Sequence, residues 1–315
     1  MKRICYLTDS LSWIQAQRAK DLQPYLPEHE LVPMLPTHLS APLPFDAFWL
    51  ASWRILLAHP EMADWLPWYF TMASVTSHYN LGGGLKPEIC FRKGSDPALE
   101  FSKAITTLKR FRLVTCNSRI LYDLLSSHLP EIVLAPNGVD AEFFHPIPYV
   151  QRSYGPPTVS WVGKDKGAKN IAAFMDALRG LDGRSALFQA IIPKKRGGPV
   201  KTRDGMRSFY WHTDFLACTS WAEGTPNPAL EAAACGVPII TTRVGNMPEL
   251  VSEGDTGWCI EPTADSLIAC IERLQHLEPH EYRRMSHNIR AEVENHWTWK
   301  IRAEAYRKAL ETLCG

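Results

Sequence analysis

The sequence has no Cys-x-x-Cys pair among its eight cysteines, although disulfide-bonded and zinc-binding domains commonly place such residues at short spacing. Several cysteines lie in apolar stretches instead, which indicates reduced, mostly buried thiols and a cytoplasmic location. No apolar run approaches the roughly 20 residues that a membrane span needs, and the apolar part of the N-terminus is too short for a signal peptide. The net charge of +1 neither favours nor excludes an anionic partner.

The chain is long enough for two domains, each with its own core, and a content of 45% hydrophobic and 21% charged residues is typical of a globular protein. Predicted strands and helices alternate along it, which indicates an α/β fold with parallel sheets and right-handed crossovers. Residues 147–157 are rich in proline and are predicted to form a linker. Ligands of such sheets bind at the carboxyl ends of the strands.

Two carboxylates, Glu223 and Glu231, lie eight positions apart across a predicted loop-to-helix junction. Asn227 is typical of an N-cap, Pro228 of the first helical position, and Gly236 of the left-handed residue that ends a helix. The start of this helix favours an anion such as a phosphate, and the carboxylates would accept hydrogen bonds from hydroxyls on either side of it. A short alanine-rich helix with a solvated glutamate is the plainer interpretation.

This segment resembles the family-4 retaining glycosyltransferases of the GT-B fold, whose signature is two glutamates separated by seven residues. The resemblance is strong over about residues 114–260 and weak before them. Further residues that fit the family pattern are Asn117–Ser118, the stretch Ala135–Asp140 with Phe144 and Pro146, Gly163, Lys169, Tyr210, Asp214, Ser220, Gly245, Pro248–Glu249 and Gly254–Gly257. Two positions depart from the pattern, since Lys164 replaces a family arginine and Asn246 stands where a second glycine is common.

The resemblance implies a GT-B architecture, in which two Rossmann-like parallel-sheet domains face a central cleft. Residues 1–147 would form the acceptor-side domain, and residues 157–296 would bind a nucleotide-sugar donor. A final helix within residues 299–315 would pack back on the first domain.

The resemblance also implies roles for the donor-side residues. Glu223 would contact the transferred sugar, Glu231 the ribose, and Lys164 and Lys169 the diphosphate. The donor-binding loops would further include Gly163, Gly224, Thr225, Pro226 and Asn227. The sequence has no Asp-x-Asp pair, so we expect neither a metal ion nor another cofactor. A solvated basic loop is the alternative for the two lysines.

In the acceptor-side domain, His78 follows a predicted strand, at the place where the family has a histidine that faces the transferred sugar. A purely structural histidine is the alternative. The glycines at 82–84 would form a mobile loop able to close over an acceptor, or a plain surface turn. The first loop lacks the glycine pair of many family members, and Asp9, Ser10 and Trp13 there are candidates for acceptor contacts.

Two further features bear on the acceptor. The tryptophans at positions 49, 53, 65 and 68 are core residues or an aromatic platform. The stretch 193–207 holds six basic residues and one acidic residue. It is expected to form a solvated loop, or alternatively to contact DNA or a membrane surface through residues 194–207.

The resulting hypothesis is a retaining hexosyltransferase that uses a UDP- or GDP-sugar and an acceptor hydroxyl of a glycan, lipid or small molecule. One alternative is a phage-type enzyme that glycosylates a hydroxymethylated pyrimidine of DNA. A non-catalytic nucleotide-sugar-binding module, a sugar phosphorylase and a nucleotide-sugar epimerase are the others.

Overall fold

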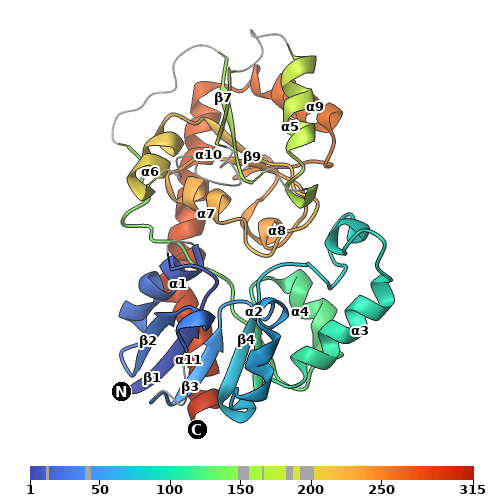
Figure 1. Ribbon diagram of the computed structural model, residues 1–315. Helices are drawn as coiled ribbons and strands as arrows, with labels where there is room; N and C mark the ends of the chain where they lie inside the picture. The colour runs from blue at the N-terminus through green and yellow to red at the C-terminus, as the bar shows by residue number, and fades with distance from the viewer. Residues whose placement is uncertain (12–13, 40–43, 148–155, 165–166, 182–186, 192–201) are drawn as a thin grey trace. The chain divides into compact units, whose positions relative to one another are not determined.

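The protein folds into two compact α/β units, each built on a parallel sheet (Figure 1). The computed structural model describes the chain except residues 12–13, 40–43, 148–155, 165–166, 182–186 and 192–201. Unit 1 comprises Met1–Gly83, Cys90–Gly138 and Trp299–Gly315, and unit 2 comprises Gly84–Ile89 and Val139–Thr298. Most of the expected linker 147–157 lies outside the described residues. In the described residues, no helix is both long and apolar enough to span a membrane.

The sheet of unit 1 has six strands in the order β2-β1-β3-β4-β5-β6. Its strands are β1 (Lys2–Leu7), β2 (His29–Met34), β3 (Ala47–Leu50), β4 (Thr71–Val75), β5 (Leu113–Cys116) and β6 (Ile132–Leu134). Its helices are α1 (Ile14–Leu22), α2 (Ile55–Ala58), α3 (Pro97–Leu108), α4 (Arg119–Ser126) and α11 (Trp299–Cys314). Strands β3, β4 and β5 are buried throughout, as helices on both faces of a parallel sheet require.

The sheet of unit 2 has five strands in the order β11-β10-β9-β7-β8. Its strands are β7 (Thr158–Val162), β8 (Leu187–Ile191), β9 (Phe215–Cys218), β10 (Ile239–Thr241) and β11 (Gly257–Cys259). Its helices are α5 (Ile171–Gly180), α6 (Arg203–Trp211), α7 (Asn227–Ala234), α8 (Met247–Leu250), α9 (Ala264–Leu274) and α10 (Pro279–Glu292). Side-chain caps fix several helix starts, as when the Thr263 hydroxyl accepts from the Ser266 N–H at the start of α9.

The last helix, α11, packs within unit 1. Its Tyr306 is fully buried, and the phenol donates to the carbonyl of Ala135 at 2.6 Å. The Tyr306 ring lies 5.4 Å from that of Trp49, a residue of β3. The chain enters and leaves the long segment of unit 2 at one place, because Val139 forms a parallel bridge with Thr298 and donates to the Trp297 carbonyl.

The predicted α/β class with two parallel sheets is confirmed. Two local predictions are wrong. Helix α7 already begins at Asn227, so Pro226 holds the N-cap position and no side chain caps the helix. The end of the basic stretch, predicted as a solvated loop, forms α6 from Arg203, whose N-terminus is capped by the Thr202 hydroxyl. The predicted left-handed residue after α7 is confirmed, since Gly236 has φ +77°.

Candidate functional site

The strand order of unit 2 reverses between the neighbouring strands β7 and β9, because β8 lies on the far side of β7 and β10 on the far side of β9. Such a switch point opens a crevice at the carboxyl ends of the two strands, where α/β proteins bind ligands. Gly163 and Lys164 follow β7, and Ser220 and Glu223 follow β9. The candidate donor-side residues therefore share one edge of the sheet.

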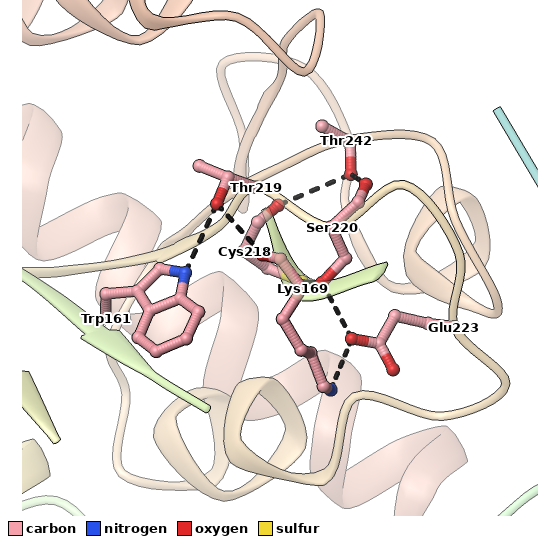
Figure 2. A network of polar contacts seen from close by, with 7 residues as sticks. All are labelled: Trp161, Lys169, Cys218, Thr219, Ser220, Glu223 and Thr242. Atoms are coloured by element: carbon pink, nitrogen blue, oxygen red, sulfur yellow. Dashed lines mark hydrogen bonds and ion pairs between the residues drawn. The ribbon is translucent and has the colours of Figure 1, made fainter. Parts of the chain in front are cut away.

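Glu223 is held at this edge by two side chains (Figure 2). Its Oε1 accepts from the ammonium of Lys169 and from the Ser220 hydroxyl, the latter at 2.7 Å. Glu223 is 8% exposed and the side chain of Lys169 is 28% exposed, so the ion pair is shielded but not sealed from solvent. Both contacts use Oε1, and in the described part of the chain Oε2 is left to accept from a ligand hydroxyl.

The turn that carries Lys169 is tied to the loop that carries Glu223. The Thr219 hydroxyl donates to the Asn170 carbonyl at 2.9 Å, and the Trp221 N–H donates to the Ala168 carbonyl at 2.8 Å. The indole of Trp161, on β7, donates to the Thr219 hydroxyl from the other side at 3.2 Å. Buried bonds of this kind hold the two charges in register without any ligand.

Asn170 continues the same connection. It adopts a left-handed conformation with φ +48°, and its amide donates to the carbonyls of Thr219 and Pro262 at 3.1 and 2.9 Å. The side-chain bonds compensate the strain that a non-glycine residue carries in this region.

Glu231 lies one turn inside α7, where its carboxylate accepts from the phenol of Tyr210 at 2.7 Å. Burial and the nearby carboxylate raise the pKa of Tyr210 well above its ordinary value, so the phenol stays protonated and remains a donor. The Tyr210 contact fixes the orientation of Glu231. At the start of α7, from Asn227, the N–H groups of Ala229 and Leu230 donate to the Pro226 carbonyl, so the positive end of the helix dipole is what would attract the expected anion.

The loop after β10 lies against the backbone of the Glu223 loop. A Cβ at Gly245, which has φ +55°, would be 2.0 Å from the Gly224 carbonyl oxygen, so only glycine permits this approach. The Thr242 hydroxyl donates to the Ser220 carbonyl at 2.6 Å. The predicted donor loops at 163–164, 224–227 and 245 are thus brought to the carboxyl edge that holds Glu223.

In unit 1, His78 follows β4 and is only 2% exposed. A Cβ on Gly83 would lie 2.0 Å from its Nδ1, so the glycine loop lies directly over the imidazole. Its role toward a sugar stays a prediction. Among the other candidates, Asp9 is exposed, Ser10 lies near the hydroxyl of Thr8, and Trp13 falls outside the described residues.

The four tryptophans of unit 1 divide into two groups. Trp49 and Trp53 are buried core residues, whereas Trp65 is 44% exposed and Trp68 is partly buried with Arg110 3.8 Å from its ring centre. These tryptophans do not form one platform.

A short segment between two parts of unit 1 belongs to unit 2. In this segment, Gly84–Ile89, the Leu85 N–H donates to the Trp221 carbonyl at 2.8 Å, and the Lys86 ammonium lies 5.1 Å from the centre of the Trp221 ring. Gly84 has φ +95°, and a Cβ there would meet the same carbonyl at 2.8 Å. The segment therefore packs on the residue two positions before Glu223, a contact that no sequence pattern indicated.

The basic stretch is described only from residue 202 onward, so Lys194, Lys195 and Arg196 lie outside the described residues. Arg203 pairs with Asp140 at 3.0 Å, and its guanidinium lies 4.5 Å from the ring centre of Phe143. Arg207 lies over the same ring at 4.4 Å. These two cations thus pack within unit 2.

The described residues contain no cluster of three histidine, cysteine or acidic side chains that could hold a metal ion. All eight cysteines are free, six of them buried. Burial raises the pKa of the Cys218 thiol, next to the site, and nearby Glu223 raises it further. Cys218 is therefore a neutral thiol, unsuited to nucleophilic chemistry.

Comparison with known proteins adds independent information. Residues 195–276 match the family model described as "Glycosyl transferases group 1". Glycogen synthase of Mycobacterium tuberculosis is 26% identical over 218 residues, which cover 61% of this chain and 52% of the relative. N-acetyl-alpha-D-glucosaminyl L-malate synthase of Bacillus anthracis is 35% identical over 112 residues, which cover 35% of this chain and 28% of the relative. The chain thus spans about half the length, or less, of these curated relatives.

Solved structures agree in fold along the whole chain. Sucrose-phosphate synthase of Thermosynechococcus elongatus superimposes with a TM-score of 0.78 at 13% identity, covering 99% of each chain. HepE of Anabaena, solved in complex with UDP-glucose, superimposes with a TM-score of 0.73 at 15% identity, covering 99% of this chain and 100% of that one.

The two parallel sheets and the agreement with these solved structures define a GT-B fold. The family match over residues 195–276 and the relatives show that unit 2 is similar to the group 1, or family-4, glycosyltransferases.

Three residues of the site had no role in the sequence-based hypothesis. Ser220 and Tyr210 fit the family pattern, and their spacing to the two glutamates is the signal that pointed to them. Thr242 directly follows the buried strand β10 and resembles any threonine at a strand end, so its bond to the Ser220 carbonyl follows only from the pairing of β9 with β10.

Proposed function

We propose that this protein transfers a hexose from a nucleoside diphosphate sugar, a UDP- or GDP-sugar, to an acceptor hydroxyl with retention of anomeric configuration. The observation that carries the proposal is the placement of Glu223 between Lys169 and Ser220 at the switch point of the donor-side sheet. The family match and the relatives support the same class of reaction.

The cation beside Glu223 suits the leaving group. An ammonium has three donors, so Lys169 can remain bound to Oε1 and also contact a phosphate oxygen. Lys164, which follows β7, and the N–H groups at the start of α7 would add positive potential to the same diphosphate. Developing negative charge on the diphosphate would thereby be stabilised without reorganisation of the site.

The carboxylates suit the two sugars of the donor. Glu231, oriented by Tyr210, would accept from the ribose hydroxyls, and Oε2 of Glu223 would accept from a hydroxyl of the transferred hexose. The bond between the anomeric carbon and the diphosphate breaks, and the acceptor oxygen bonds to that carbon on the same face. The acceptor proton passes to the departing diphosphate, so the reaction needs no enzymic nucleophile.

The acceptor is proposed as a hydroxyl of a glycan, lipid or small molecule, with His78 on the acceptor side. Burial of His78 under Gly83 is compatible with this role only when the glycine loop moves away from the imidazole.

Binding and product analysis test the proposal. Thermal unfolding is measured with UDP-glucose, UDP-N-acetylglucosamine and GDP-mannose, because a ligand that binds the native state raises the melting temperature. The stabilising donor is then incubated with candidate acceptors, and the anomeric configuration of the product is determined by NMR. A retained configuration supports the proposal, and an inverted product contradicts it. Donor binding with neither transfer nor hydrolysis would define a non-catalytic module instead.

We expect activity to persist in excess EDTA, because lysines and helix N–H groups are proposed to neutralise the diphosphate. Initial rates with and without chelator provide the measurement. Complete loss of activity that magnesium or manganese restores would contradict this expectation.

A further inference from the structure

We propose that Asn246 is a positioning residue that fixes the Glu223 loop for the hexose of the donor, acting through the hydroxyl of Thr225. The inference rests on the proposed function and adds to it a determinant of how the sugar is held.

Asn246 lies at the N-terminus of α8 and is completely buried. Its Nδ2 donates to Oγ1 of Thr225 at 3.1 Å, and its backbone N–H donates to the Gly224 carbonyl at 3.2 Å. Thr225 is itself 8% exposed, so the amide–hydroxyl bond is shielded from water. Hydrogen bonds in such surroundings are stronger than exposed ones and costly to break.

These bonds complete a clamp on both sides of Glu223. Before it, the Thr242 N–H donates to the Cys218 carbonyl at 3.0 Å and the Thr242 hydroxyl donates to the Ser220 carbonyl. After it, Asn246 binds Gly224 and Thr225. The loop after β10 is thus hydrogen-bonded to the loop after β9 both before and after Glu223 in the sequence.

The side-chain part of the clamp comes from a position that departs from the family pattern. Where the family pattern has a second glycine at position 246, a backbone N–H is available but no amide reaches Thr225. An asparagine there adds one buried bond next to the residue proposed to contact the hexose. Glu231 and the ribose-binding end of α7 are held separately, by Tyr210. Loss of the Asn246 bond should therefore affect the hexose more than the nucleotide.

A double-mutant cycle tests this directly. Asn246→Ala and Thr225→Val each remove one partner, and each should lower kcat/KM for the donor about tenfold while the Kd of the free nucleoside diphosphate changes less than twofold. The double variant should be no worse than the poorer single variant, because both changes remove the same bond. Thr225→Ser, which keeps a hydroxyl, should recover most of the activity lost in Thr225→Val.

Asn288→Ala is the matched control, since its amide donates to Asp255 at 2.7 Å on the surface of the same unit. It should leave kcat/KM unchanged. Melting temperatures of all variants identify any that fail to fold, and Thr225→Val keeps the test available when Asn246→Ala does not fold.

Losses that multiply in the double variant would overturn the inference, as would equal losses of donor turnover and nucleotide binding. A wild-type protein that neither binds nor turns over any nucleotide sugar would remove the proposed function, and this inference with it. If the wild type turns over a nucleotide sugar but the kcat/KM losses of the two single variants multiply in the double variant, only this inference fails and the proposed function stands.

Discussion

The two units each bury a charged side chain, and they accommodate it differently. Arg18 of unit 1 is 5% exposed, donates from Nε to the Tyr6 phenol at 2.8 Å and from Nη2 to the Ala51 carbonyl at 3.1 Å, and lies 5.4 Å from the centre of the Trp49 ring. Glu223 of unit 2 is nearly as buried, but its partners are a hydroxyl and the partly exposed cation of Lys169.

The difference separates a structural charge, Arg18, from the charge that is proposed to bind a ligand, Glu223. The partners of Arg18 are neutral groups of the core, which a ligand cannot replace, so this cation serves to join α1 to β1 and β3. The partner of Glu223 is a flexible cation that a phosphate can share. A buried charge thus indicates a binding site when its counter-charge can also reach a ligand.

The largest expected effect is on turnover at Glu223. Glu223→Gln keeps the size of the side chain but removes the negative charge that would stabilise the hexose as it becomes cationic. We expect kcat to fall about 10²–10³-fold, with a much smaller change in nucleotide affinity. Steady-state kinetics and titration with the nucleoside diphosphate provide the measurement.

Glu272→Gln, on the exposed face of α9, is the control for this substitution and should be silent. If Glu223→Gln only weakened nucleotide binding, or if Glu231→Gln lowered kcat alone, the assignment of the two glutamates would be reversed.

Substitution of Arg18 should act on stability instead. Arg18→Met leaves the Tyr6 phenol and the Ala51 carbonyl without their charged donor, which should cost about 2–4 kcal/mol of unfolding free energy. Urea unfolding compared with Arg92→Met, a change at an exposed arginine, measures this cost. The donor affinity of the folded protein should stay the same. A loss of donor affinity without destabilisation would break the comparison between the two charges.

Tyr210→Phe should give a smaller and more specific effect. The change removes the hydroxyl that orients Glu231 while keeping the ring, and one hydrogen bond to a charged group contributes roughly 1.5–3 kcal/mol. We expect KM for the donor and Kd for the nucleoside diphosphate to rise together, with kcat nearly constant. Phe209→Leu, a change at the neighbouring buried ring, controls for packing. A fall in kcat alone would place Glu231 on the hexose.

The smallest expected effect concerns His29, which is also buried and ionisable. Unlike Arg18 and Glu223, His29 is expected to be neutral in the folded protein. Burial lowers the pKa of His29 below its ordinary value of 6.5. A lowered pKa means that the neutral form stabilises the fold above pH 6.5, and that this contribution is lost as the pH falls further. His29→Gln should therefore reduce the loss of stability on the acid side.

Unfolding free energies measured between pH 8 and pH 5 test this, with the exposed His276→Gln as control. If the unfolding free energy of His29→Gln depended on pH in the same way as that of the wild type, groups other than His29 would be responsible for the pH dependence.

The fold of unit 2 was predictable because the sequence patterns that indicate its strands and helices are local. Buried strands such as Phe215–Cys218 are short apolar runs, and Gly236 is a glycine where a helix must end. Helix α6 was missed because its charged residues suggested solvent, whereas Arg203 and Arg207 lie over the ring of Phe143, which is 60 and 64 positions away from them in the chain. Cation–π packing of this kind leaves no periodic pattern in the sequence.

The candidate site shows the same limit. The spacing of Glu223 and Glu231 predicted where each lies relative to the helix, and the structure confirms both positions. The contact of Lys169 with Glu223 joins residues that are 54 positions apart, and the Asn246–Thr225 bond depends on the register of two loops. Such contacts arise from strand order, which the local sequence does not encode.

The bridge between Val139 and Thr298 brings together the two ends of the long segment of unit 2, the proposed donor-binding unit. Because the two ends of this segment meet, residues 139–298 can be replaced as one block by recombination at two points. The elements of unit 1 that flank the block in the chain are β6 before it and α11 after it. Under the proposed function, such an exchange would change the donor preference and leave the sequence of unit 1 intact. The condition on any such exchange is a residue at position 221 whose carbonyl still meets Leu85, since the segment Gly84–Ile89 stays behind.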